Sequence, residues 1–244
     1  MLQITQYGYI LNRNEVEEEK LASMKEMMDN IAHQWRQPLS QINSIVSVID
    51  NKLYELDIDD TLLNEKLLEI EKLTKYMSET IDDFKGYFGE EDPKQKFSIT
   101  TIIHNALDVV LPSLEAHAIT IKLINTVEVE LNAYPNELKQ IIIVLLNNAK
   151  DILISRNIHR ANITIALNDE KEKLHIIICD NGGGMTKSVM NKIFEPYFTT
   201  KHKSQGTGLG LYMSKKIIQE RFGGNMRVEN IRDGVCFYIT LPKG

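Results

Sequence analysis

Cysteine is scarce in this sequence, with Cys179 and Cys236 the only two among 244 residues. They lie far apart inside apolar runs, and no cluster of further ligands surrounds either one, so a zinc site is not expected. We predict that both are buried, reduced thiols of a cytoplasmic protein.

Long apolar runs and an excess of basic residues are missing as well. No apolar run approaches the ~20 residues that a membrane span needs, and the N-terminus lacks a signal-peptide pattern. A net charge of −6 argues against a nucleic-acid partner, because proteins that bind nucleic acids usually carry a basic face. With 43% hydrophobic and 25% charged residues, the sequence predicts a soluble globular chain. It could still be a piece of a longer, membrane-anchored protein.

Proline and glycine are almost absent between residues 14 and 88, where only Pro38 and Gly86 occur. Apolar residues recur there at alternating spacings of three and four, first over Leu21–Leu53 and again over Leu63–Phe88. This spacing predicts two long amphipathic helices. The acidic stretch Leu56–Asp60 would separate them.

Asp59 or Asp60 is placed to cap the second helix, so the two helices would form a hairpin. One hairpin cannot bury two such apolar seams well, and pairing with a second copy into a four-helix bundle is the natural solution. Periodicity alone leaves an ordinary monomeric helical domain open.

The second half has a different texture, beginning after the charged, proline-containing joint Glu90–Lys94. Strand patterns and helix patterns are interleaved without a regular alternation, which predicts an α+β sandwich with a mixed sheet and helices on one face. The expected helices are Thr101–Ala116, Glu137–Leu153 and Tyr212–Arg221; the expected strands are Thr120–Asn125, Val127–Leu131, Asn162–Leu167, Leu174–Asp180, Met226–Asn230 and Val235–Leu241.

Two glycine-rich segments stand out in this half. The glycine loop (Asp180–Met185) follows an apolar strand, and Gly206–Leu211 opens a predicted helix. Glycines permit close approach to a ligand, and a helix N-terminus presents free N–H groups to an anion. Between them, the lid segment (Ile193–Lys201) mixes aromatic residues with a proline and a lysine, as a closing lid does. Each feature alone is weak, since most such turns are merely turns.

The amides Asn147 and Asn148 fall on an apolar helix, where a polar group is unfavourable unless it finds a partner. One or both could simply face solvent. Alternatively, one of them coordinates a hard cation that bridges phosphates.

His33 is the most informative of the six histidines. The heptad seam passes through Ile31 and Trp35, so His33 faces outward, and Gln37 lies one turn later on the same face. Pro38 removes a backbone N–H and should kink the helix just beyond His33. An exposed imidazole beside a strained turn suits a nucleophile, although a lone helical histidine is usually a surface residue.

Four segments of the second half together resemble the N, G1, F and G2 boxes of the histidine-kinase ATP-binding domain. They are NELKQIIIVLLNNAKDIL, DNGGGM, IFEPYFTTK and GTGLGLYMSKK, in the family's order. The segment HQWRQPL, which begins at His33, resembles the family's H box. The resemblance covers about residues 20–244. It implies a helical hairpin that dimerises as a four-helix bundle, followed by an α+β sandwich ATP-binding domain of the Bergerat type.

The same resemblance implies roles for the matching positions. Asn148 would hold Mg²⁺ against the phosphates of ATP, and Asp180 would accept a hydrogen bond from the adenine amino group. Gly182 and Gly184 would shape the adenine pocket, and Phe194 and Phe198 would anchor the lid. The glycines Gly206, Gly208 and Gly210 would wrap the phosphates, and the remaining residues expected at the nucleotide are Asp151, Thr199, Lys201, Thr207 and Leu209.

His33 would be the phospho-acceptor, and Gln37 matches the position that orients water for dephosphorylating the response regulator. Two positions depart from the family. Gln34 stands where most relatives carry an acidic residue that takes the imidazole proton, and Val144 stands where many carry a first asparagine. Gln34 cannot act as a base, so the proton must leave by another route.

The resemblance therefore predicts a histidine kinase that is phosphorylated on His33 and passes the phosphate to an aspartate of a response regulator receiver domain. Its regions would be a signalling helix or linker at 1–19, a dimerisation and histidine phosphotransfer domain at 20–90, a linker at 91–96 and the catalytic ATP-binding domain at 97–244. We expect a cytoplasmic location, which also fits the cytoplasmic part of a membrane-bound sensor. The alternative is a nucleotide-binding dimeric scaffold or a phosphatase-only homologue.

Overall fold

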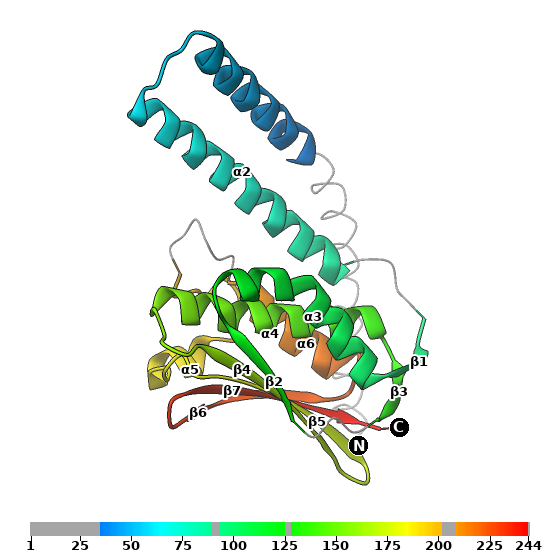
Figure 1. The fold of residues 1–244 in the computed structure, drawn as a ribbon. Helices are drawn as coiled ribbons and strands as arrows, with labels where there is room; N and C mark the ends of the chain where they lie inside the picture. The colour runs from blue at the N-terminus through cyan, green and yellow to red at the C-terminus, as the bar shows by residue number, and fades with distance from the viewer. Residues whose placement is uncertain (1–34, 89–92, 125–127, 202–207, 244) are drawn as a thin grey trace, which may run out of the picture. The chain divides into compact units, whose positions relative to one another are not determined.

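The computed structural model describes residues 35–88, 93–124, 128–201 and 208–243, and the chain divides into two compact units at residues 1–90 and 91–244 (Figure 1). The predicted signalling helix, His33 and Gln34 lie outside the described residues.

The first unit contains a helix over residues 35–55 and helix α2, Thr61–Phe88. The turn between them ends at Asp60, whose carboxylate accepts a hydrogen bond from the Leu63 N–H at 3.0 Å. This geometry is that of a helix N-cap, so of the two candidate caps Asp60 is the one that begins α2. Pro38 lies in the first described turn of the helix over residues 35–55, and residues 33 and 34, next to which the kink is predicted, lie outside the described residues.

The two helices of the first unit contact each other through a polar pair as well as through apolar residues. The Thr74 hydroxyl donates to the Asn43 side-chain oxygen across the hairpin at 2.5 Å, and Leu39, Val46 and Leu67 are buried. Many other apolar side chains of the predicted seams stay exposed, for example Ile45 at 58% and Leu73 at 44%. A single hairpin leaves much of its apolar surface in water, as the two seams predict.

The second unit is a mixed, five-stranded sheet covered on one face by helices (Figure 1). Its strand order is β2-β4-β5-β7-β6, with β2 and β4 parallel and the other neighbours antiparallel. The sheet strands are β2 Thr120–Ile124, β4 Asn162–Asp169, β5 Lys173–Asp180, β6 Asn225–Ile231 and β7 Gly234–Pro242. A separate antiparallel pair is formed by β1 Gln95–Ser98 and β3 Glu130–Ala133.

The helices of this unit are α3 Ile99–Ala116, α4 Pro135–Ser155, α5 Lys187–Lys192 and α6 Gly210–Glu220. Figure 1 shows α3, α4 and α6 over the same face of the sheet. The strands alternate accordingly: in β5, Leu174, Ile176 and Ile178 are buried while the residues between them are half-buried. This period of two places one row of side chains against the helices and the next row on the opposite face.

The predicted α+β sandwich with a mixed sheet and one helical face is therefore confirmed. Two short elements were not predicted. Strand β1 has only four residues, and helix α5 has only six, with none of them buried. Neither is long enough to display a hydrophobic period, and β1 exists because it pairs with β3.

The prediction of two reduced thiols is wrong, because Cys179 and Cys236 form a disulfide. In the antiparallel pairing of β5 with β7 these residues are direct neighbours, with Cα atoms 4.1 Å apart. Both side chains lie on the sheet face opposite the helices, since they alternate with the buried Ile178 and Phe237. Their separation of 57 residues along the chain hides this contact from the sequence.

Among the described residues, no helix combines the length and the apolar character that crossing a membrane requires.

Reduction of the Cys179–Cys236 bond should lower the free energy of unfolding. The bond closes a long loop between two central strands, and losing it should cost about 2–4 kcal/mol because the unfolded chain gains freedom. We expect a denaturant midpoint that shifts downward on adding a dithiol reductant, and the same midpoint for Cys236→Ser with or without it. A thiol titration of the untreated, unfolded protein that found two free thiols would contradict the bond.

Candidate functional site

One side of α4, next to its buried face, carries a row of side chains. Asn148, Asp151 and Ile152 follow at spacings of three and four, and Arg156 caps the end of the helix one turn further. Residues at these spacings share a face of a helix. The adjoining face buries Leu145, Leu146 and other apolar residues against the core, so packing fixes the direction in which the row points.

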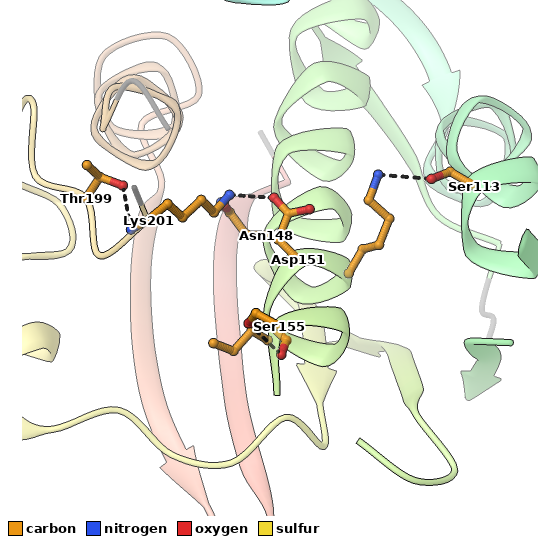
Figure 2. Close-up of polar contacts among 8 residues, drawn as sticks. Ser113, Asn148, Asp151, Ser155, Thr199 and Lys201 are labelled. Atoms are coloured by element: carbon orange, nitrogen blue, oxygen red, sulfur yellow. Dashed lines mark hydrogen bonds and ion pairs between the residues drawn. The ribbon is translucent and has the colours of Figure 1, made fainter. Parts of the chain in front are cut away.

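At one end of this row the lid segment meets α4 (Figure 2). The Lys201 ammonium lies 2.5 Å from an Asp151 carboxylate oxygen and 3.4 Å from the Asn148 side-chain oxygen. The Lys201 N–H also donates to the Thr199 hydroxyl at 3.1 Å, which holds the end of the lid segment in a turn. Four residues predicted at the nucleotide, Asn148, Asp151, Thr199 and Lys201, are therefore brought together.

The side-chain oxygens of this cluster share one cationic partner, and that partner is a lysine side chain. One amide oxygen and one carboxylate oxygen converge on the same ammonium nitrogen. Such oxygens are also the ligands that Mg²⁺ prefers, and a lysine ammonium can exchange a carboxylate for a phosphate. The Lys150 ammonium of α4 donates instead to the Ser113 hydroxyl of α3 at 3.1 Å.

Asp180, at the end of β5, is a buried carboxylate with 7% of its surface exposed. One of its oxygens accepts the Gly182 N–H at 2.8 Å. Burial raises the pKa of Asp180 above its ordinary value, and this outweighs three opposing effects that lower it: hydrogen bonds from the Gly182 and Val235 backbone and the positive charge of Arg156. The structure thus places a desolvated hydrogen-bond acceptor at the start of the glycine loop.

The rest of the glycine loop is held by two side chains that the sequence analysis missed. Arg156 donates to the Gly182 carbonyl at 2.7 Å and to the Gly184 carbonyl at 3.3 Å. The Asn230 amide donates to the Met185 carbonyl and accepts the Met185 N–H, both at 2.8 Å. No local pattern marks either residue, because their partners lie 26 to 45 residues away.

Two glycines are required by close backbone contacts near the site. A Cβ on Gly234 would stand 1.8 Å from the Asp180 carbonyl oxygen, so only glycine lets β7 begin beside the end of β5. Gly208 has φ +67°, and a Cβ there would stand 2.4 Å from the Tyr197 carbonyl carbon. Gly208 therefore brings the second glycine-rich segment against the backbone of the lid segment.

The aromatic residues of the lid segment attach it to the domain. The Phe194 ring packs edge-on against Phe237 of β7 at 6.5 Å, and the Lys215 ammonium of α6 lies 4.5 Å from the Phe194 ring centre. Phe198 is half-buried, and its own backbone is part of the backbone that approaches Gly208 closely. The lid segment is thus fixed at both ends.

The remaining predicted residues fall in three places. Leu209 and Gly210 are at the start of α6, while Gly206 and Thr207 lie outside the described residues. Gln37 is an exposed residue of the first unit. His33 and Gln34 lie outside the described residues, so the structure describes the nucleotide half of the predicted chemistry.

The second unit, and most of the chain, are similar to known proteins. Residues 133–244 match the family described as histidine kinase-, DNA gyrase B-, and HSP90-like ATPase. The chain is 28% identical over 232 residues to the two-component sensor PprA of Pseudomonas aeruginosa, covering 91% of this chain and 25% of PprA. It is 29% identical over 232 residues to the signal transduction histidine-protein kinase AtoS of Escherichia coli, covering 94% of this chain and 36% of AtoS.

A solved structure, the catalytic domain of histidine kinase ThkA, matches with a TM-score of 0.56 and 28% identity, over 62% of this chain and 97% of that one. The chain thus spans only about a quarter to a third of the two relatives' length but nearly all of a kinase catalytic domain. Residues 133–244 thus match the histidine kinase-, DNA gyrase B- and HSP90-like ATPase family, and the similarities in sequence and fold together support a sensor histidine kinase.

Proposed function

We propose that this chain is an ATP-dependent protein histidine kinase, which phosphorylates itself on His33 and passes the phosphate to an aspartate of a response regulator. The observation that carries the proposal is the convergence of Asn148, Asp151 and Lys201 at one end of the α4 row, in a domain of the ATPase family. The HQWRQPL segment that starts at His33 supplies the acceptor.

The nucleotide would lie along the row of α4 side chains. The base would meet the buried Asp180 carboxylate, which accepts a hydrogen bond from the adenine amino group, and Gly182 and Gly184 would form the wall beside it. The phosphates would lie near the Lys201 ammonium, wrapped by the segment that contains Gly206, Thr207, Gly208, Leu209 and Gly210, while Phe194 and Phe198 keep the lid segment attached.

The residues present fit a magnesium ion. The Asn148 and Asp151 oxygens already share one cationic partner, the Lys201 ammonium, and both are oxygen ligands of the kind that Mg²⁺ takes. We assign Asn148 as the metal ligand, with Asp151 beside it. When bound, the ion would offset the charge on the phosphates. Lys201 would then exchange Asp151 for a phosphate oxygen.

The nucleophile of the chemical step would be the His33 imidazole. Its neutral nitrogen attacks the γ-phosphorus, so a P–N bond forms while the P–O bond to ADP breaks, and the ring loses a proton. Gln34 has no basic group, so the proton passes to water or to phosphate. In the second step an aspartate oxygen of the regulator attacks the phosphorus, the P–N bond breaks, and the imidazole regains its proton. Lacking an acidic neighbour, His33 should be phosphorylated slowly.

Two kinds of partner follow. The exposed apolar residues of the hairpin, among them Ile45 and Leu68, favour pairing with a second copy into a four-helix bundle. The name of the relative PprA, a two-component sensor, favours a response regulator receiver domain as the acceptor. Gln37 is exposed, and this suits the role of orienting water for dephosphorylation of that regulator.

The alternative is a nucleotide-binding scaffold or a phosphatase-only homologue. Two residues favour it. Gln34 stands where most relatives have an acidic residue, and Val144 stands where many have an asparagine. Such a protein would bind ATP without acquiring phosphate.

The first prediction concerns His33. With Mg²⁺ and γ-labelled ATP, wild type should acquire acid-labile, base-stable label and His33→Gln should acquire none. The matched control is His104→Gln, because His104 is an exposed histidine on α3 of the ATP-binding unit. Label that persists in His33→Gln would refute the acceptor assignment. Absence of label in wild type, with ATP binding intact, would favour the scaffold.

A second prediction separates two neighbouring amides. Asn148→Ala should lose most of the increase in ATP affinity that Mg²⁺ produces. The loss should be at least about tenfold, because removing a metal ligand costs no less than removing a group that only hydrogen-bonds to a ligand. Asn147→Ala should keep that increase, because successive helical residues point about 100° apart. Calorimetric titrations with and without Mg²⁺ measure both. Equal effects of the two substitutions would show that Asn148 is not the metal ligand.

The third prediction is a pH dependence. The raised pKa of Asp180 means that its carboxylate becomes protonated at a higher pH than an ordinary aspartate. ADP affinity should therefore fall on the acid side as pH drops through this raised pKa, because the protonated group is a weaker acceptor. Asp180→Asn should bind about tenfold or more weakly and lack this fall. Asp108→Asn, an exposed aspartate of α3, is the control, and an acid limb unchanged in Asp180→Asn would disprove the assignment.

A further inference from the structure

The glycine loop fixes little of its own shape. Three of its six residues are glycines, which have no side chains to pack and many accessible backbone angles. Its conformation must therefore be imposed by neighbouring groups. The Gly182 N–H donates to the Asp180 carboxylate, and the Asn181 side chain bonds to residues 160 and 162. The other described contacts of the three glycines and Met185 come from Arg156 at the end of α4, from Asn230 in β6 and from the carbonyl of Asp233 in the turn between β6 and β7.

These contacts hold two peptide units from both sides. In the unit between Gly182 and Gly183, the carbonyl accepts from Arg156 and the N–H donates to the Asp233 carbonyl at 3.0 Å. In the unit between Gly184 and Met185, the carbonyl again accepts from Arg156 and the N–H donates to Asn230. Because a peptide unit is planar, two opposed hydrogen bonds set its orientation. Arg156 is the donor common to both units.

Arg156 also occupies the space over the middle of the loop. A Cβ added to Gly183, which has φ +84°, would stand 2.7 Å from the Arg156 guanidinium nitrogen. The guanidinium thus lies against the loop itself. It is anchored at the C-terminus of α4, where a positive charge interacts favourably with the helix dipole.

The Arg156 charge acts on Asp180 as well. The strand neighbours of Asp180 are Ile163 in β4 and Val235 in β7, which are both apolar. Among the described residues, Arg156 is the charged side chain that lowers the pKa of Asp180 against the effect of burial. Removing this charge should move the pKa of Asp180 further upward.

We propose that Arg156 is a positioning residue for adenine binding, which orients the two glycine-loop peptide units and keeps the Asp180 carboxylate ready to accept the adenine amino group. This inference rests on the proposed nucleotide site, since it assumes that the base binds at Asp180. Arg156 acts through the loop and through Asp180, and the adjoining cation cluster of Asn148, Asp151 and Lys201 does not depend on it.

The test compares Arg156→Met with wild type by calorimetric titration of ADP across acidic to neutral pH. Loss of a charged donor to two carbonyls should weaken ADP binding about tenfold or more. The acid limb of the affinity profile should also move to higher pH, which a purely structural role would not produce. In the autophosphorylation assay the KM for ATP should rise while kcat at saturating ATP stays close to wild type, because binding is lost equally in the ground and transition states.

Two further variants make the result decisive. Arg156→Lys keeps the charge and should restore the wild-type acid limb and part of the affinity. Arg156→Gln removes the charge at an exposed position and should move the acid limb of the affinity profile to higher pH in the same way. It decides the outcome if Arg156→Met does not fold. Arg160→Met, an exposed arginine on the following loop, is the control and should bind like wild type.

Wild-type affinity and an unmoved acid limb in Arg156→Met or in Arg156→Gln would overturn the inference while leaving the proposed function intact. Wild-type protein that binds no adenine nucleotide would overturn the proposed function, and the inference with it.

Discussion

The packing of α4 against the five-stranded sheet is the interaction on which the candidate site depends. Seven residues of this helix are buried, including Leu138, Ile142 and Leu146. Each such side chain contributes about 1.5–3 kcal/mol through burial, so the rotation of α4 about its axis is set by its core face. Asn148 and Asp151 lie beside this core face and Arg156 ends the same helix, so their directions follow from that packing.

The α4 row gives the site two ends with different chemistry. At the Asn148 end, oxygen ligands meet a lysine from the lid segment, in a polar and partly exposed environment. At the Arg156 end, a guanidinium meets the carbonyls of the glycine loop beside a buried carboxylate. A rigid helix thus separates a region suited to phosphates and a cation from a region suited to a flat, apolar base with one hydrogen-bonding edge.

The sheet supports the Asp180 end of the site through close strand pairing and one disulfide bond. Strands β5 and β7 pair up to Asp180 and Val235, and Gly234 lets the two backbones approach where a side chain would collide. The Cys179–Cys236 bond joins the same two strands one residue away from Asp180. The position of the buried carboxylate is therefore determined by three strands and a covalent bond rather than by the loop that follows it.

Much of this protein follows from the sequence by itself. Hydrophobic periods of 3.6 and 2 located nearly all of the longer helices and strands, because each period reflects one buried face of a local element. The four boxes of the second half identified the nucleotide-binding residues Asn148, Asp180 and Lys201 as candidates. The turn at residues 56–60 was also visible, since acidic cap residues interrupt the apolar seam there.

Only the tertiary structure decided which distant residues meet. The pairing of Cys179 with Cys236 depends on strand register, and the contacts of Arg156 and Asn230 with the glycine loop depend on how α4 and β6 are placed beside β5. The choice of Asn148 as the amide that reaches Lys201 depends on the rotation of α4. Local sequence patterns record the preferences of neighbouring residues, whereas these contacts arise from the packing of segments that lie tens of residues apart.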